Sequence, residues 1–282
     1  MSSGTNLKQT VKEKYADIAL GTQGLGCCGP SSSCCGSSNL VSFTMIGDDY
    51  KNVDGYVADA DLGLGCGLPT AYAGIKKGDT VVDLGSGAGN DAFIARSIVE
   101  EEGKVIGIDM TEEMVEKANN NNLKLGYDNV EFKLGDIEDM PLQDNIADVV
   151  VSNCVLNLVP NKVKAFSEIY RILKPGAHFC ISDVVIQGEL NAELKKSAEL
   201  YAGCVAGALQ QDDYLQIISD TGFSDIEIKK TKKIDLPEDL LALYLSDQGI
   251  KEYKENLSRR DGLPKGIFSI TVVGTKNKYK EV

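Results

Sequence analysis

The amino-acid sequence predicts a doubly wound α/β fold, a mostly parallel sheet with helices on both of its faces. Between residues 79 and 186, short apolar runs of strand length alternate with longer segments of helical periodicity. The first run leads into the glycine-rich turn D-L-G-S-G-A-G at residues 83–89, and the second run ends at Asp109. In such folds the glycines let the backbone approach a cofactor and the carboxylate binds a ribose hydroxyl, which indicates a nucleoside-bearing cofactor.

Composition and charge narrow the class of protein. The chain has 282 residues and a net charge of −13, which argues against a nucleic-acid partner, because phosphate backbones bind clustered lysine and arginine. No apolar run approaches the ~20 residues that a membrane span needs, and residues 1–10 lack the apolar core of a signal peptide. We therefore expect a cytoplasmic protein with neither a membrane nor a nucleic acid as partner.

Eight cysteines and a single histidine, His178, limit the chemistry. One histidine nearly excludes a histidine-based metal site or a Ser-His-Asp triad. In a reducing compartment, many cysteines in a chain of this length indicate metal binding, catalysis or redox work rather than a disulfide framework.

The region before the first strand has three parts. Residues 5–19 have helical spacing with an apolar stripe. Residues 21–38 are rich in glycine, serine and cysteine and lack periodicity, which predicts a flexible loop. Residues 40–75 are punctuated by glycine, and we expect an irregular arm that leads to the first strand.

The alternating region predicts five strands and three helices. Thr111 suits the N-cap of the second helix, because Glu112 and Glu113 follow in the first turn, where the helix dipole favours acids. The third helix should stop at the helix-ending turn of residues 174–176, K-P-G. The predicted strands are 79–84, 104–109, 129–134, 146–151 and 178–186, and the predicted helices are 90–101, 111–125 and 160–173.

After Gly188 the pattern changes to helices that cap the sheet and to two alternating strands that close it. The predicted cap helices are 190–209 and 211–220, the closing strands are 224–231 and 267–275, and a helical insertion covers 234–262.

Three regions follow from this division of the chain. They are an N-terminal helix, Cys-rich loop and arm (1–74), a cofactor-binding domain (75–188), and C-terminal cap helices, insertion and closing strands in the same sheet (189–282).

Three further details refine the glycine-rich turn. A carboxylate precedes its first glycine by two residues, an Asp136-Ile137 pair follows the third strand, and the fourth strand ends in S-N at residues 152–153. Together with the run I-Y-R-I-L-K-P-G at 169–176, this pattern resembles the S-adenosylmethionine-dependent methyltransferases of the Rossmann-like class. A nucleotide-binding dehydrogenase is the main alternative for the same turn.

The resemblance implies a set of residues that bind S-adenosylmethionine. Asp83, Gly85 and Gly87 would lie against the methionine moiety, and Asp109 would hold the ribose hydroxyls. Met110 would pack on the adenine, and Asp136 and Ile137 would bracket its ring. The full set of implied donor contacts is Asp83, Gly85, Ser86, Gly87, Gly89, Asp109, Met110, Asp136, Ile137 and Asn153.

Three cysteines lie where a second substrate would bind. Cys154 directly follows the fourth strand, at the carboxyl edge where doubly wound folds bind ligands. Cys204 lies in a predicted cap helix, and Cys66 lies in the glycine-rich arm. Three thiolates from three segments could converge on one soft atom. The alternative is ordinary packing, which we expect for Cys180 inside the fifth strand.

A second cluster of cysteines lies in the N-terminal loop, at residues 27, 28, 34 and 35. Adjacent cysteines fit a structural zinc site poorly, because paired zinc ligands are usually separated by two or more residues.

Three motifs make the resemblance more specific. They are G-L-G-C-G at 63–67, S-N-C-V-L-N-L at 152–158 and Y-A-G-C-V-A-G-A-L at 201–209. With them the chain resembles the arsenite S-adenosylmethionine methyltransferases from about residue 50 to about residue 275. The resemblance implies that the thiolates of Cys66, Cys154 and Cys204 bind trivalent arsenic as the substrate.

The same resemblance implies a redox cycle. Methylation formally oxidises arsenic, and a thiol pair can reduce it again by forming a disulfide. A further N-terminal cysteine, Cys34 or Cys35, would take part in that disulfide, and an external thiol reductant such as thioredoxin or glutathione would reopen it. Two alternatives remain open: a methyltransferase for a small organic metabolite, or a thiol-based metalloid-binding protein on a methyltransferase fold.

Overall fold

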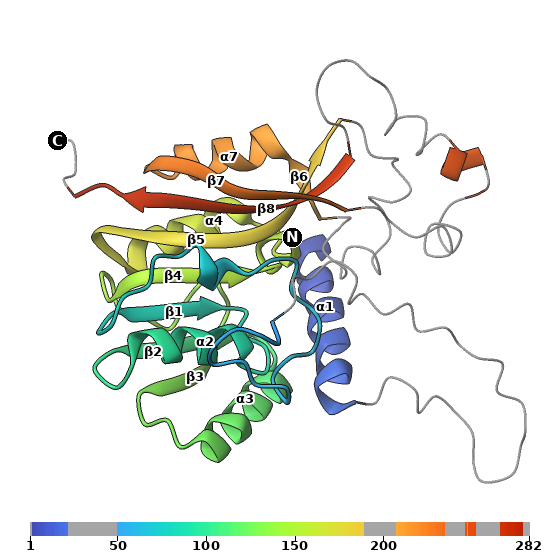
Figure 1. The fold of residues 1–282 in the computed structure, drawn as a ribbon. Helices are drawn as coiled ribbons and strands as arrows, with labels where there is room; N and C mark the ends of the chain where they lie inside the picture. Colours follow the sequence, from blue (N-terminus) through green and yellow to red (C-terminus); the bar gives the residue numbers. More distant parts are fainter. Residues whose placement is uncertain are drawn as a thin grey trace, which may run out of the picture.

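In a computed structural model, the described residues are 2–21, 50–188, 207–234, 246, 248–251 and 266–278. Within these residues the chain forms one eight-stranded sheet in the order β3-β2-β1-β4-β5-β8-β7, with β6 paired to β5 (Figure 1). The strands are β1 (Thr80–Leu84), β2 (Lys104–Asp109), β3 (Val130–Leu134), β4 (Ala147–Asn153), β5 (Leu173–Gln187), β6 (Leu209–Gln210), β7 (Phe223–Ile234) and β8 (Gly266–Lys276). The α-helices are α1 (Ser2–Leu20), α2 (Asn90–Val99), α3 (Glu112–Leu125), α4 (Lys162–Ile172) and α7 (Gln211–Asp220), and the short 3₁₀ turns are η2 (Pro69–Ala71) and η3 (Leu156–Leu158).

The sheet is parallel except for β8, which runs antiparallel to both β5 and β7. Strand β1 lies between β2 and β4, so the order of the strands reverses there. Ligands of doubly wound folds bind at such a reversal, outside the carboxyl ends of the strands. The topology therefore locates a candidate site at the ends of β1, β2 and β4.

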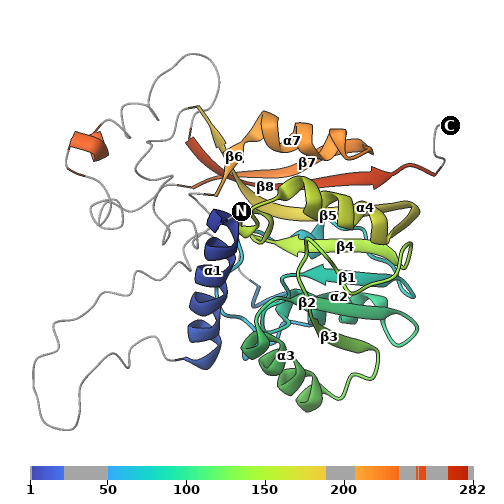
Figure 2. The same ribbon diagram turned by 180° about the vertical axis from the view of Figure 1, so that it is seen from behind.

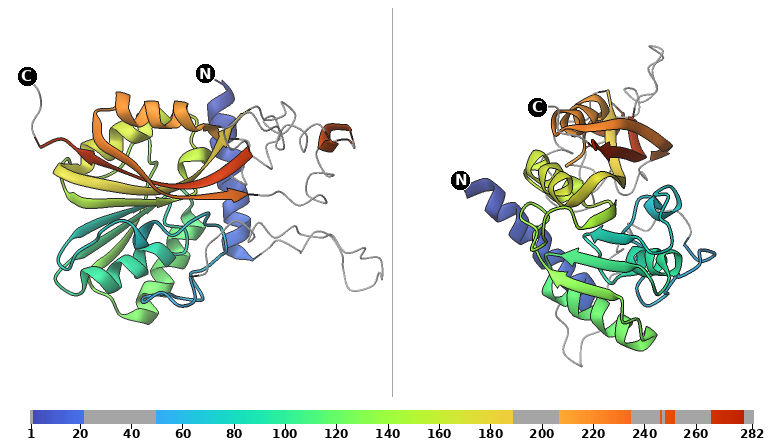
Figure 3. Two further views of the ribbon diagram at one scale, coloured as in Figure 1. Left: turned by 45° about the horizontal axis from the view of Figure 1, so that its top comes forward. Right: turned by 90° about the vertical axis from the view of Figure 1, so that its left-hand side faces the viewer.

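Alternate residues of each central strand build the two faces of the core. In β1, Val81 packs in the cluster that contains Phe93 of α2, whereas Val82 packs in the cluster that contains Phe166 of α4. Both valines are completely buried. A strand covered on both faces needs apolar residues at every position, which explains the continuous apolar runs in the sequence. The twist of the sheet is visible in the two views of Figure 3.

Helix α1 crosses the carboxyl edge of the sheet beside α3 (Figures 1 and 2). Its apolar stripe is buried at Val11, which is 1% exposed. Lys8 Nζ lies 2.6 Å from Asp136 Oδ2 and 2.7 Å from Glu138 Oε2, in the loop that follows β3. The N-terminal helix is therefore fastened to the edge of the sheet where the candidate site lies.

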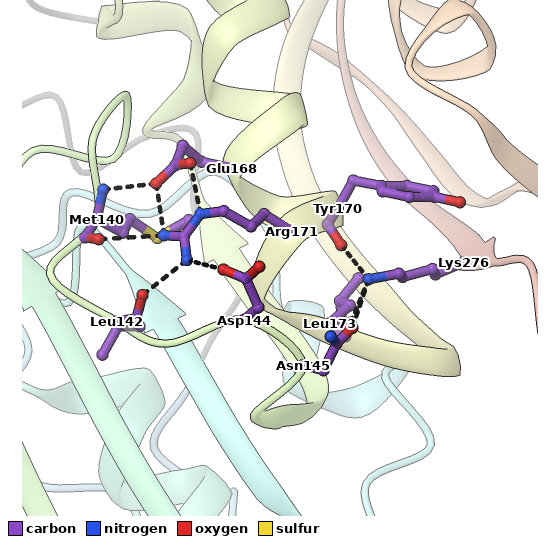
Figure 4. A network of polar contacts seen from close by, with 9 residues as sticks. All are labelled: Met140, Leu142, Asp144, Asn145, Glu168, Tyr170, Arg171, Leu173 and Lys276. Carbon is purple, nitrogen blue, oxygen red and sulfur yellow. Dashed lines mark hydrogen bonds and ion pairs between the residues drawn. The ribbon is translucent and has the colours of Figure 1, made fainter. Parts of the chain in front are cut away.

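Arg171, near the end of α4, anchors the same loop from the other side (Figure 4). Its guanidinium donates to the carboxylates of Glu168 and Asp144, each at 2.7 Å, and to the backbone carbonyls of two loop residues. The hydrogen bonds that Arg171 donates to Glu168 and then to Asp144 raise the pKa of Arg171, so the guanidinium stays charged. The loop that carries Asp136 and Ile137 is thus held by α1 at one end and by α4 at the other.

The expected strands and helices of the alternating region are confirmed, with ends that differ by a few residues. Three details differ. The helix predicted over 160–173 ends at Ile172, and the K-P-G turn lies inside β5, because the residue before a proline favours extended backbone. Leu209 lies in strand β6 rather than in a helix. Thr111 occupies the N-cap of α3, but its side chain makes no capping bond.

Several predictions fall outside the described residues. They concern the Cys-rich loop, most of the cap helix 190–209 and most of the insertion 234–262. The arm is irregular where it is described, from residue 50, apart from η2. No helix among the described residues is long and apolar enough to cross a membrane.

Candidate active site at the carboxyl edge of the sheet

A cavity opens at the carboxyl edge of the sheet, beneath α1. Its walls come from the glycine-rich turn after β1, the tip of β2, the loop after β3, the end of β4, the arm and α1. Most of the residues that the sequence predicted to bind S-adenosylmethionine line it: Asp83, Gly85, Ser86, Gly87, Asp109, Met110, Asp136, Ile137 and Asn153.

Gly89 is the one residue of this predicted set that does not line the cavity. A Cβ atom at Gly89 would come within 2.8 Å of the rings of Phe93 and Phe132. The φ angle of Gly89 is +100°, in the left-handed region that favours glycine. The backbone conformation of the turn and its close packing against the two rings therefore explain why residue 89 is a glycine.

Gly85 needs to be glycine for two reasons. Its φ angle is +64°, and a Cβ atom there would lie 2.4 Å from Val155 Cγ2. Its N–H donates to the carbonyl of Ile108 at 2.7 Å, which ties the turn to β2. The backbone therefore forms a smooth cavity wall at this point.

Asp109 shapes the turn from the tip of β2. Its Oδ2 accepts the N–H of Gly87 and its Oδ1 accepts the N–H of Thr111, both at 2.9 Å. Burial raises the pKa of Asp109, although these two backbone N–H groups oppose the rise. The carboxylate lines the cavity and keeps further lone pairs with which it could accept hydrogen bonds from ligand hydroxyls.

Three buried oxygen atoms at the cavity have no hydrogen-bond partner within the described part of the chain: Asp83 Oδ2, Ser86 Oγ and Asn90 Oδ1. Burial, together with the carboxylates of Asp91 and Asp109, raises the pKa of Asp83 well above its ordinary value. Unpaired buried acceptors are costly unless a ligand satisfies them. These residues suit a cationic group that donates hydrogen bonds, such as an ammonium group. They therefore fit the methionine end of S-adenosylmethionine.

The charges at the cavity also favour a cation. The carboxylates of the described lining residues belong to Asp61, Asp83, Asp91, Asp109 and Asp136, and Lys8 is the one lysine among them. The ammonium group of that lysine is already paired with Asp136 and Glu138. A ligand that carries positive charge would therefore be attracted electrostatically.

Cys154 lines the cavity directly after β4, and Cys66 follows Gly65, which also lines the cavity. Both are buried, with 5% and 1% exposure. The N–H of Cys66 donates to Asn153 Oδ1 at 3.0 Å, and Asn153 directly precedes Cys154 in the chain. The structure brings two of the predicted arsenic ligands into one region. Cys204, Cys34 and Cys35 lie outside the described residues, as do Cys27 and Cys28.

The remaining described cysteine and the single histidine are occupied elsewhere. Cys180 Sγ donates to the carbonyl of Pro69 at 3.2 Å, and burial raises the pKa of this thiol to about 12. It is a neutral, packed thiol, as expected for a buried cysteine. His178, within β5, is hydrogen-bonded through Nε2 to the carbonyl of Ala73 at 2.5 Å.

The site also contains residues that the sequence did not single out. Tyr50 and Asp91 line the cavity and are hydrogen-bonded to each other at 3.2 Å. Asn153, which was predicted to contact the cofactor, donates to both of them and also contacts the backbone of the arm. Asp91 could have been found from the sequence, because it closely follows the glycine-rich turn at 83–89 and lies in the first turn of α2. No pattern in the sequence indicated Tyr50.

Residues 75–222 match the family described as Methyltransferase domain, which covers more than half of the 282 residues. The strand order, the glycine-rich turn and the cavity at its edge agree with that match. They define the class of protein as a methyltransferase with a Rossmann-like sheet.

Comparison with individual proteins narrows the class. The chain is 41% identical over 248 residues to the arsenite methyltransferase of Halobacterium salinarum, which covers 85% of this chain and 61% of that protein. It is 32% identical over 266 residues to the arsenite methyltransferase of Aquipseudomonas alcaligenes, which covers 91% of this chain and 73% of that protein. The X-ray structure of CrArsM, an arsenic (III) S-adenosylmethionine methyltransferase from Chlamydomonas reinhardtii, matches with a TM-score of 0.60 and 33% identity, over 73% of this chain and 65% of that one.

The chain belongs to the arsenite methyltransferase family. It spans 61% of the length of the Halobacterium salinarum relative. The fold class and the family that the sequence predicted are both confirmed.

Proposed function

We propose that this protein transfers a methyl group from S-adenosylmethionine to trivalent arsenic held by the thiolates of Cys66, Cys154 and Cys204. One observation carries the proposal. Cys154 lines the same cavity as Asp83 and Asp109, and the adjacent residue Asn153 is hydrogen-bonded to the backbone of Cys66. Membership of the arsenite methyltransferase family supports the same substrate.

The donor would lie in the cavity with its charged end toward Asp83. S-adenosylmethionine supplies an electrophilic methyl group on a positively charged sulfur atom. The unpaired oxygens of Asp83, Ser86 and Asn90 would accept hydrogen bonds from its ammonium group. Asp109 would hold the ribose hydroxyls, with Gly85 and Gly87 against the methionine. Met110, Asp136 and Ile137 would surround the adenine.

The acceptor chemistry suits the residues that are present. Thiolates select soft centres such as trivalent arsenic. Arsenic bound by thiolates keeps a lone pair, so it can attack a methyl group without a general base. The protein would then contribute mainly by holding the two reactants in line. The only histidine is hydrogen-bonded to Ala73 and is not needed as a base.

Turnover requires a reductant. Methylation takes arsenic formally to the pentavalent state, and two thiolates can return it to the trivalent state as they join in a disulfide. We assign one of these thiolates to Cys34 or Cys35, and an external thiol such as thioredoxin or glutathione would reduce the disulfide. This chemistry suits the reducing cytoplasm. In this arrangement residues 75–188 bind the donor, residues 1–74 supply the arm and the Cys-rich loop, and residues 189–282 supply the cap.

The test is a methylation assay with purified protein, arsenite, S-adenosylmethionine and a thiol, in which methylated arsenicals are separated and quantified. Cys154→Ser and Cys204→Ser should each abolish or nearly abolish the first methylation. Cys180→Ala is the matched control, because this buried thiol is hydrogen-bonded to the carbonyl of Pro69 and should be dispensable for methylation. Full activity of either Ser variant would refute the thiolate site, and turnover of an organic metabolite instead of arsenite would favour a different methyltransferase.

A further inference from the structure

The backbone of Cys66 is held between two strands of the sheet by side chains. Asn153 Oδ1, at the end of β4, accepts the Cys66 N–H at 3.0 Å. Ser269 Oγ, on β8, donates to the Cys66 carbonyl at 2.7 Å. Ser269 is 4% exposed and Cys66 is 1% exposed, so water competes little for these bonds. Both peptide groups of Cys66 are therefore fixed to the rigid framework.

The residues on either side of Cys66 must be glycine for this contact to form. A Cβ atom at Gly65 would lie 2.7 Å from Asn153 Nδ2, and one at Gly67 would lie 2.6 Å from Ser182 Oγ. Asn153 makes further bonds to Gly67, because it accepts its N–H at 3.2 Å and donates to its carbonyl at 2.8 Å. The arm thus lies directly against β4 and β5, with no room for side chains between them.

Cys154 is fixed to the same edge. It follows Asn153 in the chain, and its N–H donates to the carbonyl of Ser182 at 2.8 Å. Its φ angle is +62°, in the left-handed region that residues with a Cβ atom rarely adopt. The surrounding structure maintains this unfavourable conformation, as is common at functional sites. The backbone of Cys66 is therefore fixed to β4 and β8, and that of Cys154 follows β4 and is fixed to Ser182 of β5.

We propose that Asn153 and Ser269 are positioning residues that hold Cys66 at a set distance from Cys154, so that the two thiols are arranged for arsenic before it binds. The inference rests on the proposed function, since it concerns the same arsenic site. Neither side chain ligates arsenic in this arrangement; each acts through the backbone of Cys66. A site held in advance binds its ligand more tightly, because less freedom is lost on binding.

The experiment measures arsenite binding to the full chain under reducing conditions, without a methyl donor, for the wild type and for Ser269→Ala. We expect Ser269→Ala to weaken arsenite binding roughly 3- to 10-fold, the cost of ordering one more segment on binding. Donor affinity should not change, because Ser269 does not line the donor cavity. Ser269→Thr, which keeps the hydroxyl group, should restore arsenite affinity.

Thr221→Val is the matched control. It removes a hydroxyl-to-carbonyl bond of the same 2.7 Å length at the end of α7, outside the site. Its arsenite affinity should equal that of the wild type. If Ser269→Ala fails to fold, Asn153→Ala tests the other side of Cys66 by the same measurement, with a loss at least as large expected, because Asn153 also bonds to the backbone of Gly67.

The outcomes separate the two proposals. Wild-type binding together with weaker binding by the folded Ser269→Ala or Asn153→Ala variant supports the inference. Arsenite affinity that equals the wild type in a folded variant overturns the inference but leaves the proposed function standing. Failure of the wild-type protein to bind arsenite overturns the proposed function, and the inference with it.

Discussion

Lowering the pH from 7.5 to 5 should weaken the binding of S-adenosylmethionine about tenfold through one group, Asp91. This carboxylate lines the cavity at the carboxyl edge of the sheet, where we propose that the donor binds. Burial raises its pKa from the ordinary 3.8 to about 6, although the bonds from Asn153 and Tyr50 oppose the rise. A cationic donor favours the ionised carboxylate. At pH 7.5 the group is almost fully ionised, and at pH 5 only about one tenth of it is.

The assay is equilibrium binding of S-adenosylmethionine at both pH values to the wild type and to Asp91→Asn. The wild type should lose about ten times more affinity than the variant between the two pH values. Asp59→Asn is the control, because this exposed carboxylate pairs with Lys124 outside the cavity and should leave the pH dependence unchanged. An equal loss of affinity in the wild type and in Asp91→Asn would refute the reasoning.

The same pKa shift predicts the opposite effect on the stability of the unliganded protein. Because folding raises the pKa of Asp91, the folded state binds a proton that the unfolded state releases between pH 4 and pH 6. Relative to Asp91→Asn, the wild type should therefore gain stability as the pH falls through this range and lose it as the pH rises. Urea denaturation at several pH values measures the difference. A relative stability that rises with pH would contradict the assignment.

Three further predictions follow from particular contacts. Lys276→Met should lower the free energy of unfolding by about 2–4 kcal/mol in urea denaturation, because Lys276 Nζ donates to Asn145 Oδ1 and to two backbone carbonyls at the end of α4 (Figure 4). The control Lys278→Met, at an exposed position, should change it by less than about 0.5 kcal/mol. Lys8→Met should weaken donor binding about threefold by calorimetry, because α1 covers the cavity and is fastened through two partly exposed ion pairs; unchanged affinity would show that α1 contributes nothing to closure. Gly85→Ala should lower the thermal midpoint and donor affinity together, because its Cβ atom would overlap Val155; wild-type values for both would contradict the observed turn.

The sheet could be predicted because its signals are local. The central strands β1, β2 and β4 are buried on both faces, so each is a short, nearly continuous apolar run with helical segments between, whereas the edge strand β3 alternates buried and partly exposed residues. The turn at 83–89 could be predicted equally well, since its three glycines have positive φ angles that other residues avoid. Burial and backbone geometry act on neighbouring residues, and neighbouring residues are what a sequence pattern records.

Strand β6 could not be predicted from the local sequence pattern. Leu209 suits the apolar stripe of a helix, yet it pairs with Val185 of β5. The pairing brings together residues distant in the chain, and no periodicity of a two-residue strand can indicate it. The docking of α1 is a similar case. Its apolar stripe predicted a helix, but the contact of Lys8 with Asp136, across 128 residues, determines where the helix lies.

The candidate site combines both kinds of information. The position of Cys154 at the cavity could be predicted, because this cysteine follows a buried strand at the carboxyl edge of the sheet. The contact between Asn153 and Cys66 could not, because the two residues are 87 positions apart in the chain. One local signal was nevertheless present: a cysteine between two glycines indicates a backbone that approaches another part of the chain closely. Gly65 and Gly67 have that function, and the surface that they approach belongs to Asn153 and Ser182. The donor turn and the cysteine arm therefore share one device, in which glycine lets the backbone itself form the wall of the site.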